Sequence, residues 1–185
     1  MLTSEKRYEE FAYVLDFLSE GKSMVIKGRE GPIIQAIGEE RLTLLELLAV
    51  ENQDFELGEK LRIGREGRDK IVSVLGKLAY EDLTSEAKAQ LPSVCEAIVK
   101  SKEARYVSYF NDLQPLTPRL HGLELIPGIG KTFMKTIVEE REKKPFVSFE
   151  DIQDRTGLRD PAKLMARRVV EEISGDSRIN IFIKK

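Results

Sequence analysis

The chain has 185 residues, of which 34% are charged and 41% hydrophobic, and its formal net charge is -2. This composition is typical of a folded globular protein and too apolar for a disordered one. The single cysteine, Cys95, and the single histidine, His121, exclude a disulfide framework and any zinc site built from Cys and His clusters within one chain.

The distribution of apolar and charged residues bears on location and partners. No apolar run approaches the roughly 18 residues that span a bilayer, and the N-terminal sequence MLTSEKRYEE lacks the apolar core of a signal peptide. We therefore expect a cytoplasmic protein with no membrane partner. Residues 117–185 contain 14 Lys and Arg against 11 Asp and Glu, whereas residues 1–116 contain 16 against 21. Binding of a polyanion would therefore be focused at a site rather than spread over a face.

Residues 1–83 are predicted to be rich in strands. Apolar or alternating runs at residues 11–18, 33–38 and 41–50 indicate strands, and Leu61 and Ile63 share one face of a short strand bounded by glycines. Residues 70–80 fit either a strand or a helix. Several short strands with glycine-rich turns favour a small closed β-barrel, which removes exposed sheet edges.

Residues 84–116 are predicted to be a helical connector. A Ser or Thr cap opens a helix at LTSEAKAQ, and Pro92 then suits the first turn of a second helix, where a missing amide donor does no harm. Cys95 is expected in the core. Tyr106 and Phe110 have spacings typical of a buried helix face, although aromatic side chains can also stack on bases.

Residues 117–175 are predicted to be short, well-capped helices. Thr117 caps and Pro118 opens the first helix, a second helix begins at Lys131, and Ser148 with Asp151 forms a capping box for a third. Another helix opens at Pro161. In residues 176–185, isoleucines at alternate positions predict a final strand. The predicted fold class is therefore α+β.

The sequence LELIPGIGKT ends like a nucleotide-binding P-loop. That motif requires a glycine five positions before Gly130, and Leu125 occupies this position. The context also differs, because a P-loop follows a buried strand and this turn is expected to follow a helix. A triphosphate-binding loop is therefore disfavoured.

A Gly-apolar-Gly turn between two helices predicts a different kind of phosphate site. Gly128 and Gly130 let the backbone approach a partner closely, while Ile129 anchors the turn in the core. The amides of Gly130, Lys131 and Thr132 would face outward at the positive end of a helix dipole. Lys131 adds a mobile charge and Thr132 a hydroxyl donor. None of these groups identifies a base, so binding would be independent of sequence.

Residues 123–152 resemble the first hairpin of a tandem helix-hairpin-helix module, such as those of competence DNA receptors, Holliday-junction proteins and excision nucleases. With YEDLTSEAKAQLP, FNDLQPLTPRLH and the strand-rich start, the whole chain resembles an uncharacterised archaeal family predicted to join an OB-like barrel to this module. The resemblance implies that the hairpin amides hold phosphate oxygens, in some members through a monovalent cation. No other cofactor and no metal site are implied.

The second hairpin would be TGLRDP. Gly157 matches the expected pattern, but Arg159 replaces the second glycine, and Asp160 with Pro161 lengthens the turn by about one residue. Arg159 could contact a nucleic-acid backbone, whereas Asp160 opposes binding and suits a helix cap. Binding by this hairpin and simple packing against the first one both stay open.

We therefore expect a non-enzymatic nucleic-acid-binding protein, and the resemblance favours RNA over DNA. An OB-like barrel at residues 1–83 would bind through a set of cations near one strand and loop: Lys60, Arg62, Arg65 and Arg68. The first alternative is a protein-contact or scaffold module that uses the helical hairpins. A metal-dependent nuclease is a second alternative, disfavoured because adjacent carboxylates such as Glu139 and Glu140 point to different sides of a helix.

Overall fold

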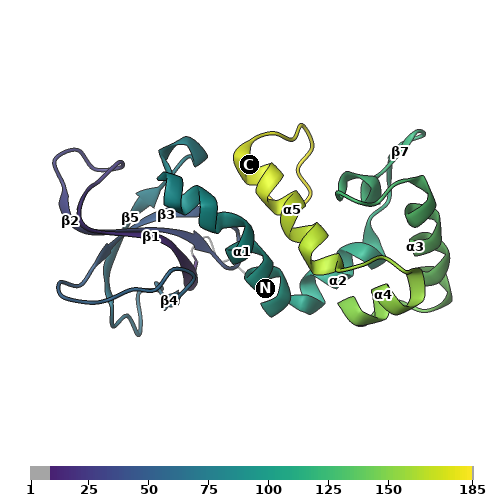
Figure 1. Ribbon diagram of the computed structural model, residues 1–185, viewed down its shortest axis with the longest axis horizontal. Coiled ribbons are helices and arrows are strands. Elements are labelled where there is room, and N and C mark those ends of the chain that lie inside the picture. The colour runs from purple at the N-terminus through teal and green to yellow at the C-terminus, as the bar shows by residue number, and fades with distance from the viewer. Residues whose placement is uncertain (1–8, 185) are drawn as a thin grey trace, which may run out of the picture. The chain divides into compact units, whose positions relative to one another are not determined.

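Five strands form one antiparallel sheet in the computed structural model, which describes residues 9–184 (Figure 1). The strands follow the spatial order β4-β1-β2-β3-β5. Their bounds are β1 Phe11–Lys22, β2 Glu30–Gly38, β3 Leu44–Ala49, β4 Lys60–Arg62 and β5 Ile71–Lys77. The predicted strands are confirmed, and the ambiguous segment 70–80 supplies β5.

The sheet is curled into a half-barrel, so the predicted closed barrel is confirmed only in this coarser form (Figure 1). Bulges in β1 between Val14 and Asp16 and between Leu18 and Gly21 bend that long strand. The edges of the sheet are β4 and β5. Because β4 has only three residues and pairs with β1, it offers little backbone for closure.

Apolar side chains are buried on both faces of the sheet. In β2, Ile33, Ile34, Gln35 and Ala36 are all buried, although successive side chains of a strand point to opposite faces. Gln35 exchanges hydrogen bonds with the segment before α1 (Ser85–Ser101): its Nε2 donates to the Asp82 carbonyl at 3.0 Å, and the Thr84 amide donates to its Oε1 at 2.9 Å. One cluster of buried core residues is made of Ala12, Val14, Ile34, Ala36, Leu45, Leu47, Ala49, Leu61, Ile63 and Ile71.

The helices predicted within residues 84–116 are α1 and α2 (Glu103–Asp112), after the 3-10 helix η1 (Tyr80–Asp82). The predicted cap of α1 is confirmed, because the Ala87 amide donates to the Thr84 hydroxyl at 3.0 Å. The placement of Pro92 in a first turn is wrong. Pro92 lies inside α1, which runs without interruption from Ser85. Its ring is exposed, and the proline removes only one amide donor from the helix.

The chain divides into two compact units, and we describe each by itself. One consists of residues up to Val94 together with those from Ile173 onward, and the other of Cys95–Glu172. Cys95 is 0% exposed, which confirms its predicted place in the core, and burial raises the pKa of its thiol to about 12.

After α2, the chain forms a β-hairpin rather than the predicted helix at residues 118–126. Strands β6 (Pro115–Thr117) and β7 (Leu120–His121) pair, and the 3-10 helix η2 (Gly122–Leu125) follows. The hydroxyl of Thr117 accepts from the amides of Arg119 and Leu120, which closes a turn instead of capping a helix.

Three helices follow along the chain: α3 (Lys131–Lys143), α4 (Phe149–Thr156) and α5 (Pro161–Ser174). The cap of α4 is confirmed, since the Asp151 amide donates to the Ser148 hydroxyl at 2.9 Å. The reciprocal bond of the predicted capping box is shifted by one residue, because Asp151 accepts from the Val147 amide.

No strand is assigned within residues 176–184, so the predicted C-terminal strand stays a prediction. These residues form bends and irregular backbone. The Ser177 hydroxyl donates to the Asn180 side chain at 3.0 Å. The buried residue is Phe182, at 5% exposed, whereas Ile179 is 41% exposed, so the alternating isoleucines do not mark a core face.

Candidate functional site

The predicted phosphate-binding turn lies between η2 and α3. Ile126 and Ile129 are 0% and 4% exposed, and the Ile129 amide donates to the Ile126 carbonyl at 3.1 Å. Ile129 therefore anchors the turn as predicted. Gly128 has a φ of +88°, a conformation that a residue with a Cβ adopts only with strain. The turn is thus rigid on its inner side, while Gly128 and Gly130 are exposed.

Gly130 is the N-cap of α3, with φ -94° and ψ -168°, values that any residue adopts. A Cβ at this position would meet nothing within 4 Å. Neither backbone conformation nor packing within the described chain therefore requires glycine here. Because glycine has no side chain, it also leaves uncapped the amides that a Ser or Asp at this position would satisfy.

The amides at the start of α3 differ from those of three other helices. Thr84 caps α1, Ser148 caps α4, and His121 caps η2 by accepting from the Leu123 amide. Among residues 9–184, by contrast, no hydrogen-bond acceptor is recorded for the amides of Gly130, Lys131 and Thr132, and all three residues are exposed. This helix start can therefore accept an external anion.

Lys131 is held in an ion pair rather than free beside the turn. Its ammonium lies 3.0 Å from both carboxylate oxygens of Glu124 and donates to the Arg119 carbonyl at 2.5 Å. The His121 amide, followed by Lys131, holds the pKa of the Glu124 carboxyl below its ordinary value. Because the pair is neutral overall, the electropositive character of the turn comes chiefly from its amides and the helix dipole.

The second predicted hairpin connects α4 to α5 and uses its amides internally. Gly157 ends α4 with a φ of 78°, and its amide donates to the Gln153 carbonyl. The Leu158 amide donates to the Thr156 hydroxyl at 3.2 Å, and the Asp160 amide to the Gln153 side chain at 3.1 Å. Arg159 is exposed. This geometry favours the packing interpretation of the second hairpin over phosphate binding.

Helix α5 supports the first turn from behind. A Cβ on Gly128 would meet the Leu164 side chain at 3.2 Å, so the two residues are in close contact. One helical turn further, the buried guanidinium of Arg168 donates to the Leu125 carbonyl at 3.3 Å. Arg168 also pairs with the buried Glu172 at 3.1 Å. Leu164 and Arg168 therefore fix both ends of the turn.

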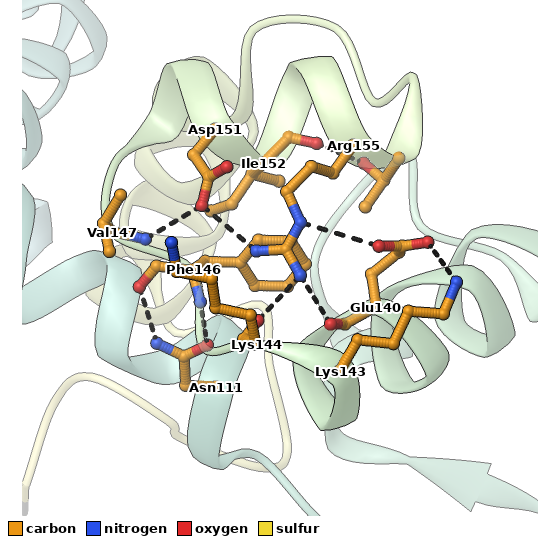
Figure 2. Close-up of polar contacts among 10 residues, drawn as sticks. Asn111, Glu140, Lys143, Lys144, Phe146, Val147, Asp151, Ile152 and Arg155 are labelled. Carbon is orange, nitrogen blue, oxygen red and sulfur yellow. Dashed lines mark hydrogen bonds and ion pairs between the residues drawn. The ribbon is translucent and has the colours of Figure 1, made fainter.

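A second network joins the end of α3 to α4 (Figure 2). The Arg155 guanidinium lies over the Phe146 ring at 4.5 Å and donates to the carbonyls of Glu140 and Lys144 at 2.5 and 2.7 Å. It also pairs with the carboxylates of Asp151 and Glu140. In Figure 2, the Asn111 side chain from α2 both donates to and accepts from the Phe146 backbone. Arg155 thus satisfies carbonyls at the α3 C-terminus.

The predicted cations of the sheet fall into two groups. Lys60 and Arg62, on β4, lie over the Phe11 ring at 4.5 and 4.9 Å, and Lys60 also pairs with the nearly buried Glu39 at 2.8 Å. Their exposed side chains follow the predicted alternation, because Leu61 between them is 4% exposed.

Arg65 and Arg68 lie in the loop after β4. Arg65 is exposed, whereas Arg68 donates to the carbonyls of Ile63, Gly64 and Val72. Arg68 therefore holds this loop together, and only Arg65 of the two presents an exposed cation.

The described residues contain no group of three or more His, Cys, Asp or Glu side chains arranged to hold a metal ion. None of the helices between residues 9 and 184 is long and apolar enough to cross a membrane.

Comparison with known proteins identifies relatives along nearly the whole chain. A model of the family described as "Protein of unknown function (DUF655)" matches residues 8–184. The chain belongs to this family. It is 40% identical over 178 residues to the uncharacterized protein MJ0038 of Methanocaldococcus jannaschii, a match that covers 96% of this chain and 80% of that protein. The crystal structure of Af1531 from Archaeoglobus fulgidus, another DUF655 protein, is similar with a TM-score of 0.83 and 40% identity, over 95% of this chain and 100% of that one. The resemblance to an uncharacterised archaeal family is therefore confirmed at the level of the family.

Sequence reasoning missed the residues that position the turn. Glu124, Leu164 and Arg168 were not predicted, although Arg168 and Glu172 stand at the i, i+4 spacing of a helical ion pair. That spacing signals a pair but not its burial or its contact with the Leu125 carbonyl. Arg155 was also missed, because its partners lie on another helix.

Proposed function

We propose that this family member binds the phosphate backbone of a nucleic acid, without catalysis and without sequence preference, through the turn Gly128–Gly130 and the start of α3. The single observation that carries the proposal is the uncapped N-terminus of α3 behind an exposed glycine. Gly130 has no intramolecular reason to be glycine, and its amide and the next two have no recorded acceptor among the described residues. A phosphate oxygen satisfies such amides and needs the close approach that glycine permits.

The strand order β4-β1-β2-β3-β5 supports the accompanying OB-like interpretation of the first unit, and the exposed Lys60, Arg62 and Arg65 supply cations there. The turns around Gly128 and Gly157 support the tandem helix-hairpin-helix interpretation of the second. RNA is the preferred polymer, and a monovalent cation at the first turn stays a prediction. The two units would contribute independent contacts, so the total affinity would reflect both.

The proposal is tested by replacing Gly130 with aspartate. Asp is a good N-cap residue, so Gly130→Asp should keep or slightly raise stability while its carboxylate occupies the amides and repels phosphate. The matched control is Ser148→Asp, which adds the same charge at the N-cap of α4 in the same unit. Fluorescence anisotropy with duplex DNA, single-stranded RNA and structured RNA would be measured at two salt concentrations.

With about four phosphates contacted, log K should fall with log salt at a slope of about -3 to -4. Gly130→Asp should weaken binding by about tenfold or more, equivalent to about 1.4 kcal/mol, and Ser148→Asp should have little effect. Absence of binding to every probe, or equal affinities of the two variants, would refute the proposal. Metal-dependent cleavage of a probe would instead indicate an enzyme.

A protein contact is the second candidate function. Val147 and Leu116, both in the second unit, are 69% and 47% exposed, which is unusual for large apolar side chains. A partner protein captured by the wild type and lost on Val147→Ser, with no nucleic-acid binding, would favour this candidate.

A further inference from the structure

The loop between β1 and β2 exposes three consecutive apolar side chains. Met24, Val25 and Ile26 are 60%, 39% and 42% exposed. Val25 leans on the sheet, because a Cβ added to Gly76 of β5 would meet its Cγ1 at 2.6 Å. Met24 and Ile26 are the more exposed of the three. Consecutive exposed apolar residues on a loop are a feature of interaction surfaces, whereas single ones are ordinary.

This loop is held in a defined conformation by a buried carboxylate. Glu46 on β3 is 0% exposed and accepts from the Ser23 hydroxyl at 2.5 Å and the Met24 amide at 2.7 Å. The Ser23 hydroxyl in turn accepts from the amides of Val25 and Ile26. A buried carboxylate is costly unless its oxygens are hydrogen-bonded, and here those bonds go to the loop. The apolar tip is therefore ordered before a partner arrives, which lowers the entropic cost of binding.

The loop also carries a net positive charge. The segment KSMVIKGR contains three cations, Lys22, Lys27 and Arg29, and no carboxylate. All three are exposed, and within residues 9–184 none of them has a recorded ion pair. Of the nearby carboxylates, the buried Glu46 is hydrogen-bonded to Ser23 and Met24, and the exposed Glu20 and Glu30 flank the segment, with Glu30 opposite Lys22 in the β1–β2 register. An apolar tip between free cations suits a partner that offers negative charge and apolar faces side by side.

We propose that the β1–β2 loop is a second nucleic-acid contact, in which Lys27 and Arg29 pair with phosphates and Met24 and Ile26 pack against the bases of a single strand. The inference rests on the proposed function and adds single-stranded RNA as the class of ligand for the first unit. The bases of a duplex are stacked on one another, so an apolar side chain reaches their faces only after costly unstacking. In a single strand the same faces are accessible.

A lipid surface fits these residues less well. A myristoyl chain, with about 14 carbons, gives only marginal and reversible membrane binding. Met24, Val25 and Ile26 together have fewer side-chain heavy atoms than such a chain has carbons, and all three are only partly exposed. The three cations add electrostatic attraction to an anionic leaflet, but this loop does not present the apolar helix face typical of stable interfacial binding.

The test uses two double variants of the full chain. Met24→Ser with Ile26→Ser removes the apolar tip, and Lys27→Gln with Arg29→Gln removes the charges. All four side chains are exposed, so both variants should unfold at the same urea concentration as the wild type. The controls are Val147→Ser, at an exposed apolar residue of the other unit, and Arg41→Gln, at the end of β2 opposite to the loop.

The probes are a short uridine-rich single-stranded RNA, an RNA duplex and vesicles containing phosphatidylserine. The apolar double variant should weaken single-strand binding by about three- to tenfold, which is at the low end of the loss seen when an aromatic side chain that stacks on a base is removed. The slope of log K against log salt should stay unchanged. The charge double variant should make the slope of log K against log salt shallower by about 1.4, or about 0.7 for each phosphate. Duplex binding should change less than single-strand binding in the apolar variant.

The outcomes separate this inference from the function on which it rests. If both loop variants bind single-stranded RNA as the controls do, while Gly130→Asp still loses binding, the loop contact is overturned and the proposed function stands. If the wild type binds none of the nucleic acids, both fall. If the apolar variant loses vesicle binding but keeps RNA affinity, the loop is a lipid contact and the inference is wrong.

Discussion

Replacing Arg155 with methionine tests whether one side chain fixes the junction between α3 and α4. Methionine keeps much of the side-chain volume, so the substitution removes the guanidinium without leaving a large cavity. Five contacts are lost: the bonds to the Glu140 and Lys144 carbonyls, the ion pairs with Asp151 and Glu140, and the stacking on Phe146.

The magnitude follows from these contacts. A hydrogen bond from a charged donor contributes about 1.5 to 3 kcal/mol. The Glu140 carbonyl keeps a second donor, the Lys144 amide, and Lys144 is exposed to water, so the two carbonyl bonds together contribute near the low end of that range. The partly exposed ion pairs add about 0.5 to 1 kcal/mol, and the stacking adds about 1 kcal/mol. We therefore expect Arg155→Met to lower the free energy of unfolding by about 3 to 4 kcal/mol.

Urea unfolding followed by far-ultraviolet circular dichroism measures this loss. Arg155→Lys should recover less than half of it, because an ammonium cannot bind two carbonyls in the planar geometry of the guanidinium or stack on the Phe146 ring as well. The matched control is Arg159→Met in the following turn, where the side chain is exposed and the change should stay within about 0.5 kcal/mol. An Arg155→Met protein as stable as Arg159→Met would show that the junction does not depend on this network.

Three further predictions concern stability and protonation. Arg168→Met should lower the free energy of unfolding by about 3 to 5 kcal/mol in urea titrations, because it removes the partner of the buried Glu172. Adding Glu172→Leu should recover part of the loss. Full additivity of the two effects on the free energy of unfolding would contradict the pairing. Thr84→Ala should cost about 1 to 2 kcal/mol by removing the cap of α1, and a loss below about 0.3 kcal/mol would count against it. Burial, followed by the charge of Arg141, lowers the pKa of His121, and the Nδ1 of this side chain accepts a hydrogen bond. Proton NMR of the single histidine should therefore show titration below pH 6.5. The unfolded chain then binds the proton more tightly, so stability due to His121 is present above about pH 6.5 and is lost as the pH falls below it; an NMR pKa at or above 6.5 would contradict this cap.

Much of the sheet was predictable, because apolar runs with flanking turns are local in the sequence. Leu61 and Ile63 were expected on one face, and both are buried. The closure of the barrel was not predictable, because it depends on how much backbone β4 leaves to pair with β5. The helix expected after Thr117 shows a different limit. A hydroxyl that accepts from amides two and three residues later serves a helix cap and a tight turn equally well, and only tertiary contacts decide between them.

The candidate turn was predictable in its glycines but not in its electrostatics. The pattern of Gly128 and Gly130 indicated a positive φ and a close approach, and the structure gives Gly128 a φ of +88°. The ion pair of Lys131 with Glu124 could not be read from the sequence, because the chain reverses between them. The same is true of Leu164 and Arg168, which reach the turn from a helix more than thirty residues away.

Because Cys95 is buried, the reactivity of its thiol measures local opening of the chain. It is the single thiol of the sequence, it is 0% exposed, and a pKa of about 12 leaves almost no thiolate at neutral pH. A thiol reagent can therefore react only with molecules in which α1 has opened around this residue. When reclosing is faster than labelling, the labelling rate reports the free energy of that opening directly, in the unmodified protein and under native conditions. The same chemistry applied with and without RNA would show whether a ligand stabilises the middle of α1, with no added probe.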